Sequence, residues 1–385
     1  MLVDEIGESP ILSLIDRIFA LREQGESVLG LHIGEPDFDT PKGIRDAAYR
    51  AMNEGLTHYG SAQGMPELRA AIAARLSERH AIPASAREVV VLSAKFGIYA
   101  SLLATVGAGD EVLLPNPTYL FEQPIRLVGA RPVYAPLGKD FALDPAALEA
   151  AVTPRTKLLI LVSPGNPTGR VLRRAEVEAA LEFARDHGLT VVSDETYESL
   201  IYEGQHVAPA SLAKGEVPVI TIGSFSKVYA MTGWRAGYAV APPKIRARLV
   251  TIMEHTLTCL PMFIQKACLW GLENAAADEV RFREEFRGRR DHLLAGLAKL
   301  PGISPVRPEG AFYVFPRYSL PLRSVDLALR LLEEERLALV PGISFGPSGE
   351  RHLRISYTSP IEQLDEGLRR LGRFLERHRA AAPSP

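Results

Sequence analysis

Five short apolar runs, separated by polar and amphipathic stretches, constrain the fold of this chain more than any other feature of its sequence. The runs are rich in β-branched residues and lie at 89–92, 111–114, 157–162, 189–192 and 217–222. Such runs are typical of strands buried on both faces of a mainly parallel sheet. The alternation with helical patterns therefore predicts an α/β fold.

Two of the helical patterns between these runs carry end signals. Residues 173–187 precede Gly188, which suits the left-handed position after a helix. Residues 144–152 begin at Asp144, which can accept hydrogen bonds from the first N–H groups of a helix. Both segments are predicted to be crossover helices of the sheet.

The sequence has a different character on either side of this region. Helical patterns dominate from 243 to about 300, and short strands and helices mix after that. Near the start, Pro36 and Pro41 exclude a helix at 34–41. We expect a smaller α+β domain beside the large one, divided as follows: an N-terminal arm at 1–14, the small domain at 15–43 with 285–385, and the large domain at 44–284.

The composition excludes several classes of function. With 44 basic and 46 acidic side chains the 385-residue chain has a net charge of −2, so we expect no nucleic-acid or membrane partner. Two cysteines cannot build a disulfide framework, and the first residues lack a basic leader. We expect a cytoplasmic protein. Only nine of the basic residues are lysines, so an amine nucleophile has few candidates.

Polar side chains follow three of the predicted strands. In chain order they are Asn166, then Asp194 with Tyr197, then Ser224 with Lys227. Taken singly, each has an ordinary explanation as a turn, cap or loop residue. Ligands of open α/β sheets bind at the carboxyl ends of the strands, so together these residues predict a binding site.

The chemistry of this set suits an aldehyde cofactor with a pyridine ring and a phosphate. Lys227 can form a Schiff base if burial and neighbouring cations lower the pKa of its amine. Asp194 can keep a pyridine nitrogen protonated, which makes the ring an electron sink. Asn166 and Tyr197 can both hydrogen-bond a phenolate oxygen on such a ring.

Residues suited to a phosphate lie nearby in this scheme. Ser93, Ala94 and Lys95 follow an apolar run and begin a predicted helix, whose N–H groups and dipole attract an anion. Ser224 can add a hydroxyl, and Arg235 can add a guanidinium that matches phosphate geometry.

Tyr119 and Arg354 complete the candidate site. Tyr119 can lie flat on an aromatic cofactor, or it can be an ordinary half-buried tyrosine. Arg354 lies inside an apolar predicted strand, where a substrate carboxylate would make a bidentate partner. A structural salt bridge is the alternative.

These motifs occur in an order that resembles the class I/II aminotransferases of the aspartate aminotransferase superfamily, which are fold-type-I pyridoxal phosphate enzymes. The resemblance covers nearly the whole chain and includes Tyr59 and the segments 34–41 (GEPDFDTP), 64–69 (GMPELR), 166–169 (NPTG), 194–197 (DETY), 224–227 (SFSK), 233–237 (GWRAG), 308–313 (PEGAFY) and 353–356 (LRIS). It implies a mainly parallel seven-stranded sheet and pyridoxal 5'-phosphate as the cofactor. The implied reaction moves an α-amino group between an amino acid and a 2-oxo acid.

The same resemblance implies a role for each candidate residue. Lys227 carries the Schiff base and shuttles a proton, Asp194 pairs with the pyridinium, and Tyr197 is a catalytic residue that binds the phenolate oxygen. The remaining roles are as follows: Asn166 for the phenolate oxygen and the substrate, Tyr119 for stacking, Ser93, Ala94, Lys95, Ser224 and Arg235 for the phosphate, and Gly34 and Arg354 for the substrate carboxylate. Tyr59 resembles a tyrosine that reaches the phosphate of the neighbouring subunit, which implies a homodimer with shared active sites.

Two departures from the family pattern concern the phosphate site and the substrate. Ser93 stands where a glycine is common, and no arginine is identified for a distal carboxylate. In some relatives a lysine at the position of Lys95 binds that carboxylate. By family position, Ile11, Lys95 and residues 256–262 line the side-chain pocket, and their mostly apolar character favours neutral or aromatic substrates.

Other classes of function remain for comparison. A pyridoxal phosphate lyase, cyclase or oxidase would use the same lysine, aspartate and arginine. A nicotinamide-dependent dehydrogenase would need a Gly-x-Gly-x-x-Gly turn after the first strand, which the sequence lacks. His255, Cys259 and Cys268 fit no zinc-site spacing, so we expect no metal.

Overall fold

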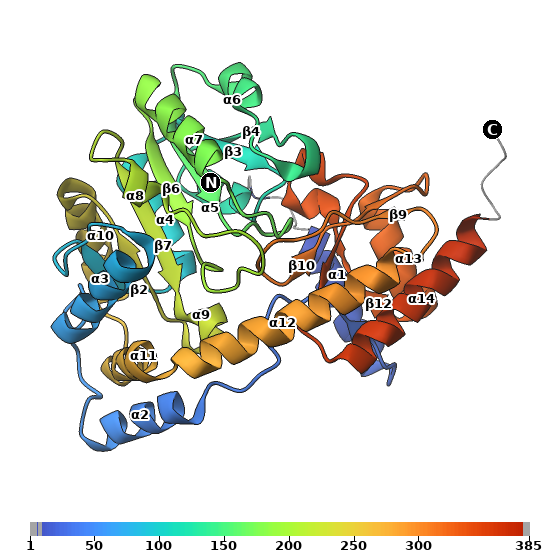
Figure 1. The fold of residues 1–385 in the computed structure, drawn as a ribbon, viewed down its shortest axis with the longest axis horizontal. Helices are drawn as coiled ribbons and strands as arrows, with labels where there is room; N and C mark the ends of the chain where they lie inside the picture. The colour runs from blue at the N-terminus through green and yellow to red at the C-terminus, as the bar shows by residue number, and fades with distance from the viewer. Residues whose placement is uncertain (1–5, 7–9, 380–385) are drawn as a thin grey trace.

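The computed structural model describes residue 6 and residues 10–379, and its largest element is a seven-stranded sheet (Figure 1). The strand order is β2-β8-β7-β6-β5-β3-β4. The strands are β2 (Val89–Leu92), β3 (Glu111–Asn116), β4 (Arg131–Pro136), β5 (Thr156–Val162), β6 (Thr190–Asp194), β7 (Val219–Ser224) and β8 (Gly237–Val240). Only β8 runs antiparallel to its neighbours, β2 and β7. The predicted mainly parallel α/β sheet is confirmed.

The sequence pattern predicted five of these strands and missed β4 and β8. It also ended three strands early, because β3, β6 and β7 extend to Asn116, Asp194 and Ser224. Asp194 and Ser224 are therefore the last residues of their strands and do not follow them. The crossover helices were predicted correctly, and Asp144 accepts hydrogen bonds from the N–H groups of Ala146 and Ala147.

Helices cover both faces of the sheet because successive strand side chains point to opposite faces. Val90 and Val112 pack against one group of helices: α4 (Ala94–Thr105), α5 (Glu122–Leu127) and α10 (Pro243–Thr256). Val89 and Leu113 face the other group: α3 (Pro66–His80), α6 (Pro145–Ala151), α7 (Arg174–Asp186), α8 (Pro209–Leu212) and α11 (Met262–Asn274). The helix α2 (Lys42–Asn53) lies outside, against α11 (Figure 1).

A second group of elements packs around another apolar core, which is rich in aromatic side chains such as Phe282, Phe286 and Phe374. Tyr197, Leu200 and Tyr202, which follow β6, also pack into this core. Its helices are α1 (Pro10–Glu23), α13 (Ser324–Glu335) and α14 (Ile361–Arg379). Its short strands are β1 (Leu29–Gly30), β9 (Ile303–Ser304), β10 (Tyr313–Val314), β11 (Arg317–Tyr318), β12 (Leu337–Ala338), β13 (Val340–Pro341) and β14 (Leu353–Ser356). This is the smaller α+β unit that the sequence predicts.

The long helix α12 (Ala276–Leu297) links the two groups and crosses from α11 to α14 (Figure 1). Of the arm expected at 1–14, residues 1–5 and 7–9 lie outside the described residues, and α1 begins at Pro10. Residues 380–385 of the expected small domain also lie outside them. No helix in the described ranges is long and apolar enough to span a membrane.

Candidate active site

A cavity of about 280 Å³ lies at the edge of the sheet where the parallel strands end. Every predicted site residue except Ser93 and Tyr59 lines it: Gly34, Ala94, Lys95, Tyr119, Asn166, Asp194, Tyr197, Ser224, Lys227, Arg235 and Arg354. The structure thus brings together residues that are far apart in the sequence, and Gly34 and Arg354 are separated by 320 positions. Their assigned roles remain predictions.

Lys227 lies in α9 (Phe225–Val228), the single helical turn that follows β7. Its Nζ donates a hydrogen bond to the carbonyl oxygen of Gly34 at 2.7 Å. Burial, reinforced by the cations of Arg354 and Arg235, lowers the pKa of the Lys227 amine to about 8, against the opposing charges of Glu35 and Asp194. A substantial fraction of the amine is therefore neutral near pH 7, as a nucleophile requires.

Asp194 presents a buried carboxylate at the end of β6. Its Oδ1 accepts hydrogen bonds from the backbone N–H of Thr196 at 3.1 Å and from the Thr196 hydroxyl at 2.5 Å. Burial raises the pKa of this carboxyl, although both of these bonds and Lys227 oppose the shift. A cation against the remaining oxygen would offset the cost of burial, and a protonated ring nitrogen is such a cation.

Arg354 is a buried arginine for which the described residues provide no carboxylate partner. Its Nη2 donates to the carbonyl oxygen of His32 at 2.6 Å and its Nη1 to Oδ1 of Asn166 at 3.2 Å, while its Nε has no acceptor. Among the described residues, Arg354 therefore does not form the structural salt bridge that was the alternative. A buried charge is costly unless it is paired, so the cavity favours an anionic ligand at this guanidinium.

Three groups that can bind an anion, Arg235, Ser224 and the N-terminus of α4, lie where the backbone of Gly237 packs closely against other backbone atoms. A Cβ atom on Gly237 would lie 2.5 Å from the carbonyl oxygen of Gly223 and 3.0 Å from the backbone nitrogen of Ala94, so only glycine fits. Because β8 is antiparallel, its first residues meet the edge where the other strands end. Arg235 and Ser224 thereby join the first N–H groups of α4, and such N–H groups lack acceptors within a helix.

Ser93 acts as the N-cap of α4 and does not line the cavity. Its hydroxyl accepts a hydrogen bond from the backbone N–H of Phe96 at 3.4 Å, and its φ of −77° is accessible to any residue. The position therefore does not require the glycine that is common in the family pattern, and the cradle at Ala94 is compatible with serine.

Two tyrosines predicted to contact the cofactor, Tyr119 at the ring and Tyr59 at the phosphate of the neighbouring subunit, differ in their exposure. Tyr119 lines the cavity, and burial raises the pKa of its phenol to about 12, so it is a neutral aromatic surface. Tyr59 is 88% exposed and does not line the cavity of its own chain. Residues 256–262, expected at the side-chain pocket, do not line it either.

Sequence reasoning missed Tyr313, which also lines the cavity. Its hydroxyl lies 2.8 Å from the hydroxyl of Tyr197, and its ring lies 4.5 Å below the guanidinium carbon of Arg354. The signal that could have found it was its place as the last residue of the motif at 308–313. Ile98, Leu120 and Thr196 were missed as well.

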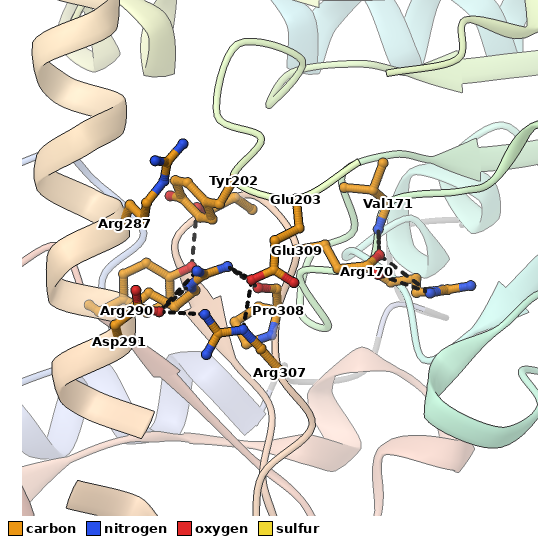
Figure 2. A network of polar contacts seen from close by, with 12 residues as sticks. Arg170, Val171, Tyr202, Glu203, Arg287, Arg290, Asp291, Arg307, Pro308 and Glu309 are labelled. Atoms are coloured by element: carbon orange, nitrogen blue, oxygen red, sulfur yellow. Dashed lines mark hydrogen bonds and ion pairs between the residues drawn. The ribbon is translucent and has the colours of Figure 1, made fainter. Parts of the chain in front are cut away.

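A polar network fixes the segment that precedes Tyr313 (Figure 2). The Glu309 carboxylate accepts hydrogen bonds from the backbone N–H of Val171 at 3.1 Å and from Arg170 at 3.3 Å. Arg290 of α12 donates to the carbonyl oxygen of Pro308 at 2.9 Å. The backbone N–H groups of residues 309 and 310 both reach the carbonyl oxygen of Gly169. These bonds tie the segment to the turn that carries Asn166.

The mainly parallel sheet and the residues that line its cavity suit a pyridoxal phosphate enzyme, and comparison with known proteins identifies its family. The family model described as aminotransferase class I and II matches residues 26–371. The chain belongs to this family, and it is a pyridoxal phosphate-dependent aminotransferase that acts on amino acids and 2-oxo acids.

Three relatives illustrate the similarity. A probable aspartate/prephenate aminotransferase from Aquifex aeolicus is 38% identical over 97% of this chain and 98% of its own. The structure of aspartate aminotransferase from Thermus thermophilus with maleate matches with a TM-score of 0.92 and 36% identity, over 97% and 98% of the two chains. An aromatic aminotransferase from Pyrococcus horikoshii matches with a TM-score of 0.89 and 39% identity, over 94% and 99%.

Proposed function

We propose that Lys227 attaches the cofactor and then moves the substrate's α-proton during exchange of the amino group. The observation that carries this proposal is one cavity that holds a lysine with a lowered pKa, a buried carboxylate and a buried arginine without a carboxylate partner. When bound, the cofactor supplies an electron sink for negative charge on the α-carbon. The chain's own residues bind it, orient the substrate and handle the proton.

The residues around Lys227 divide the cofactor between them. With the cofactor bound, Asp194 would face the ring nitrogen, and its buried carboxylate would hold a proton there. Asn166 and Tyr197 would donate hydrogen bonds to the ring's phenolate oxygen. Tyr119 would pack on the ring, and the phosphate would be held by the N-terminus of α4 with Ala94 and Lys95, by Ser224 and by Arg235.

Arg354 binds the substrate's α-carboxylate in this proposal. Its contacts to His32 and Asn166 fix the guanidinium plane, and its Nε remains without an acceptor. Gly34 lies in the loop opposite, where its carbonyl oxygen holds Nζ of Lys227 at 2.7 Å. A carboxylate on Arg354 would thus place the substrate's α-carbon within the same cavity as the lysine amine.

The cavity wall suits a substrate with a neutral or aromatic side chain, and Lys95 would bind the carboxylate of an acidic one. Ile11, Ile98 and Leu120 make the wall apolar, and Lys95 is a cation among them. Lys95 forms no ion pair with any described residue. The names of the relatives include both aspartate and aromatic substrates, which agrees with a wall of this mixed kind.

A homodimer with shared sites is the second part of the proposal. Tyr59, Tyr49 and Leu257 are large apolar side chains that are 88%, 66% and 53% exposed. The backbone N–H of Gly60 donates to Sγ of Cys259 at 3.3 Å, so Tyr59 and the loop at 257–261 form one surface. A second copy of the chain would cover this surface and receive Tyr59 near its phosphate site.

The domain division and the location of the protein are part of the same proposal. The cores on the faces of the large sheet support a large domain at 44–284, and the aromatic-rich core supports a small one made of 15–43 and 285–385. Tyr197, Leu200, Tyr202 and Phe282 of the large domain pack into the aromatic-rich core, so the two domains are in contact there. Free cysteines and near-neutral charge suit the cytoplasm.

A half-reaction screen tests the proposed function. Purified holoenzyme is mixed with each of the common amino acids, and loss of the visible absorbance is followed together with formation of pyridoxamine phosphate. Neutral, aromatic or acidic amino acids should convert the cofactor stoichiometrically. Release of ammonia or pyruvate without pyridoxamine phosphate would instead indicate a lyase.

A further inference from the structure

We infer that Tyr313 is a positioning residue that orients Tyr197 with its hydroxyl and supports Arg354 with its ring. The inference rests on the proposed function, in which Tyr197 faces the phenolate oxygen of the cofactor and Arg354 binds the substrate carboxylate. It concerns a residue outside the set that the sequence motifs assigned to the site.

The hydroxyl of Tyr313 has one hydrogen-bond partner among the described residues, the hydroxyl of Tyr197 at 2.8 Å. Both side chains are buried, and burial raises the pKa of both phenols, so each keeps its proton. A phenol has a single proton to donate. When Tyr197 donates to an anionic oxygen in the cavity, Tyr313 must be the donor to Tyr197. That second hydrogen bond polarises Tyr197 and makes it a better donor.

The position of the Tyr313 hydroxyl is tightly determined. A Cβ atom on Gly34 would lie 1.9 Å from the hydroxyl oxygen, so the phenol packs directly against the Gly34 backbone. The same Gly34 carbonyl accepts the hydrogen bond from Nζ of Lys227. Four residues before Tyr313, Glu309 accepts a hydrogen bond from the backbone N–H of Val171 (Figure 2), and its own backbone N–H donates to the carbonyl oxygen of Gly169.

The ring of Tyr313 has a separate task. The guanidinium carbon of Arg354 lies 4.5 Å from its centroid and 5.0 Å from that of Phe345. Stacking of this kind is a cation–π contact, and it restricts the plane of the guanidinium. The ring therefore helps Arg354 face a carboxylate, whereas the hydroxyl acts on Tyr197.

Two variants separate these tasks. Tyr313→Phe keeps the ring and removes the hydroxyl, so the KM for an amino acid should stay within about twofold of the wild type. The pH midpoint of the holoenzyme's visible absorbance change should rise by roughly half a unit. With Tyr197 a poorer donor, the ring oxygen keeps more negative charge, and the neighbouring nitrogen contributed by Lys227 holds its proton to higher pH. Tyr313→Leu removes the ring too and should raise KM about fivefold or more.

A double variant and a control make the test specific. Tyr197→Phe should shift the midpoint further than Tyr313→Phe, and adding Tyr313→Phe to it should change nothing more, because the hydroxyl acts through Tyr197. Tyr357→Phe is the matched control: Tyr357 is buried, its hydroxyl donates to the carbonyl oxygen of Ala311 at 3.3 Å, and it does not line the cavity. It should leave the midpoint and KM unchanged.

The outcomes distinguish this inference from the proposed function. A shift in Tyr197→Phe without any shift in Tyr313→Phe, or equal shifts in Tyr313→Phe and the control, would overturn the inference alone. A wild-type protein that binds pyridoxal phosphate without a lysine-dependent visible band would overturn the proposed function, and the inference with it.

Discussion

The protonation of Lys227 can be tested directly through the rate at which the apoenzyme takes up its cofactor. The pKa of the amine is lowered from its ordinary value of 10.5 to about 8, chiefly by burial. At pH 7 about one tenth of such amines are neutral, against about three in ten thousand for an ordinary lysine. Because only the neutral amine attacks the aldehyde, the structure predicts a gain of roughly 300-fold in the reactive fraction.

The assay mixes apoenzyme with excess pyridoxal phosphate between pH 6 and 10 and follows the growth of the visible band. The rate should rise about tenfold per pH unit and level off near pH 8. N-acetyl-lysine amide is the control for the intrinsic reaction, and its rate should keep rising past pH 9.

Two charge variants sharpen this prediction because they act in opposite directions. The charge of Glu35 raises the pKa of Lys227 and that of Arg354 lowers it. Glu35→Gln should therefore move the plateau to lower pH and speed uptake at pH 7, whereas Arg354→Gln should move it to higher pH and slow uptake. A wild-type rate that climbs without a plateau to pH 10, or shifts of the same sign in both variants, would refute the reasoning.

Three further predictions follow from the same contacts. Lys227→Met should stabilise the apoenzyme at pH 7 by up to about 3 kcal/mol in denaturant unfolding, because the folded state no longer holds a buried ammonium. Between pH 8 and 10.5 the unfolded wild type binds more protons than the folded wild type, so the stability of the wild type rises with pH. The difference in stability between the variant and the wild type should therefore shrink over this range. Arg354→Lys should raise the KM for amino acids about tenfold or more in steady-state kinetics, since a point charge replaces a planar fork, and an unchanged KM would place the carboxylate elsewhere. Equal amounts of Tyr59→Ala and Lys227→Ala subunits, refolded together, should recover about a quarter of wild-type activity if sites are shared between subunits, and no recovery would argue against sharing.

The sequence predicted the central strands because each is a continuous apolar run that is buried on both faces. β4 was missed because it is a half-exposed edge strand and therefore forms no continuous apolar run. It also contains Pro132 and Pro136, which are unfavourable inside a strand. β8 escaped because it has four residues and begins with a glycine, and its pairing with both β2 and β7 decides its structure.

The site was predictable where local rules apply. Asp194 and Ser224 end their strands and Lys227 lies in the helical turn after β7. The carboxyl ends of parallel strands meet at one edge of the sheet, where ligands bind. Tyr313 obeys no such rule, because it belongs to β10 of the smaller unit and meets Tyr197, 116 residues away in the sequence, only in the folded chain. Tyr59 is a different case, because its proposed role depends on a surface of the assembly and not on the fold of one chain.

The pairing of β7 with β8 has a consequence for which changes this protein can tolerate. Ser224 and Gly237 lie directly opposite one another in the ladder, so residues 225–236 form a loop whose two ends are pinned. That loop carries both Lys227 and Arg235. One inserted or deleted residue between the pinned ends would move the amine by up to about 3.5 Å relative to Asp194. We therefore expect the loop to accept exchanges of side chains but no change in its length.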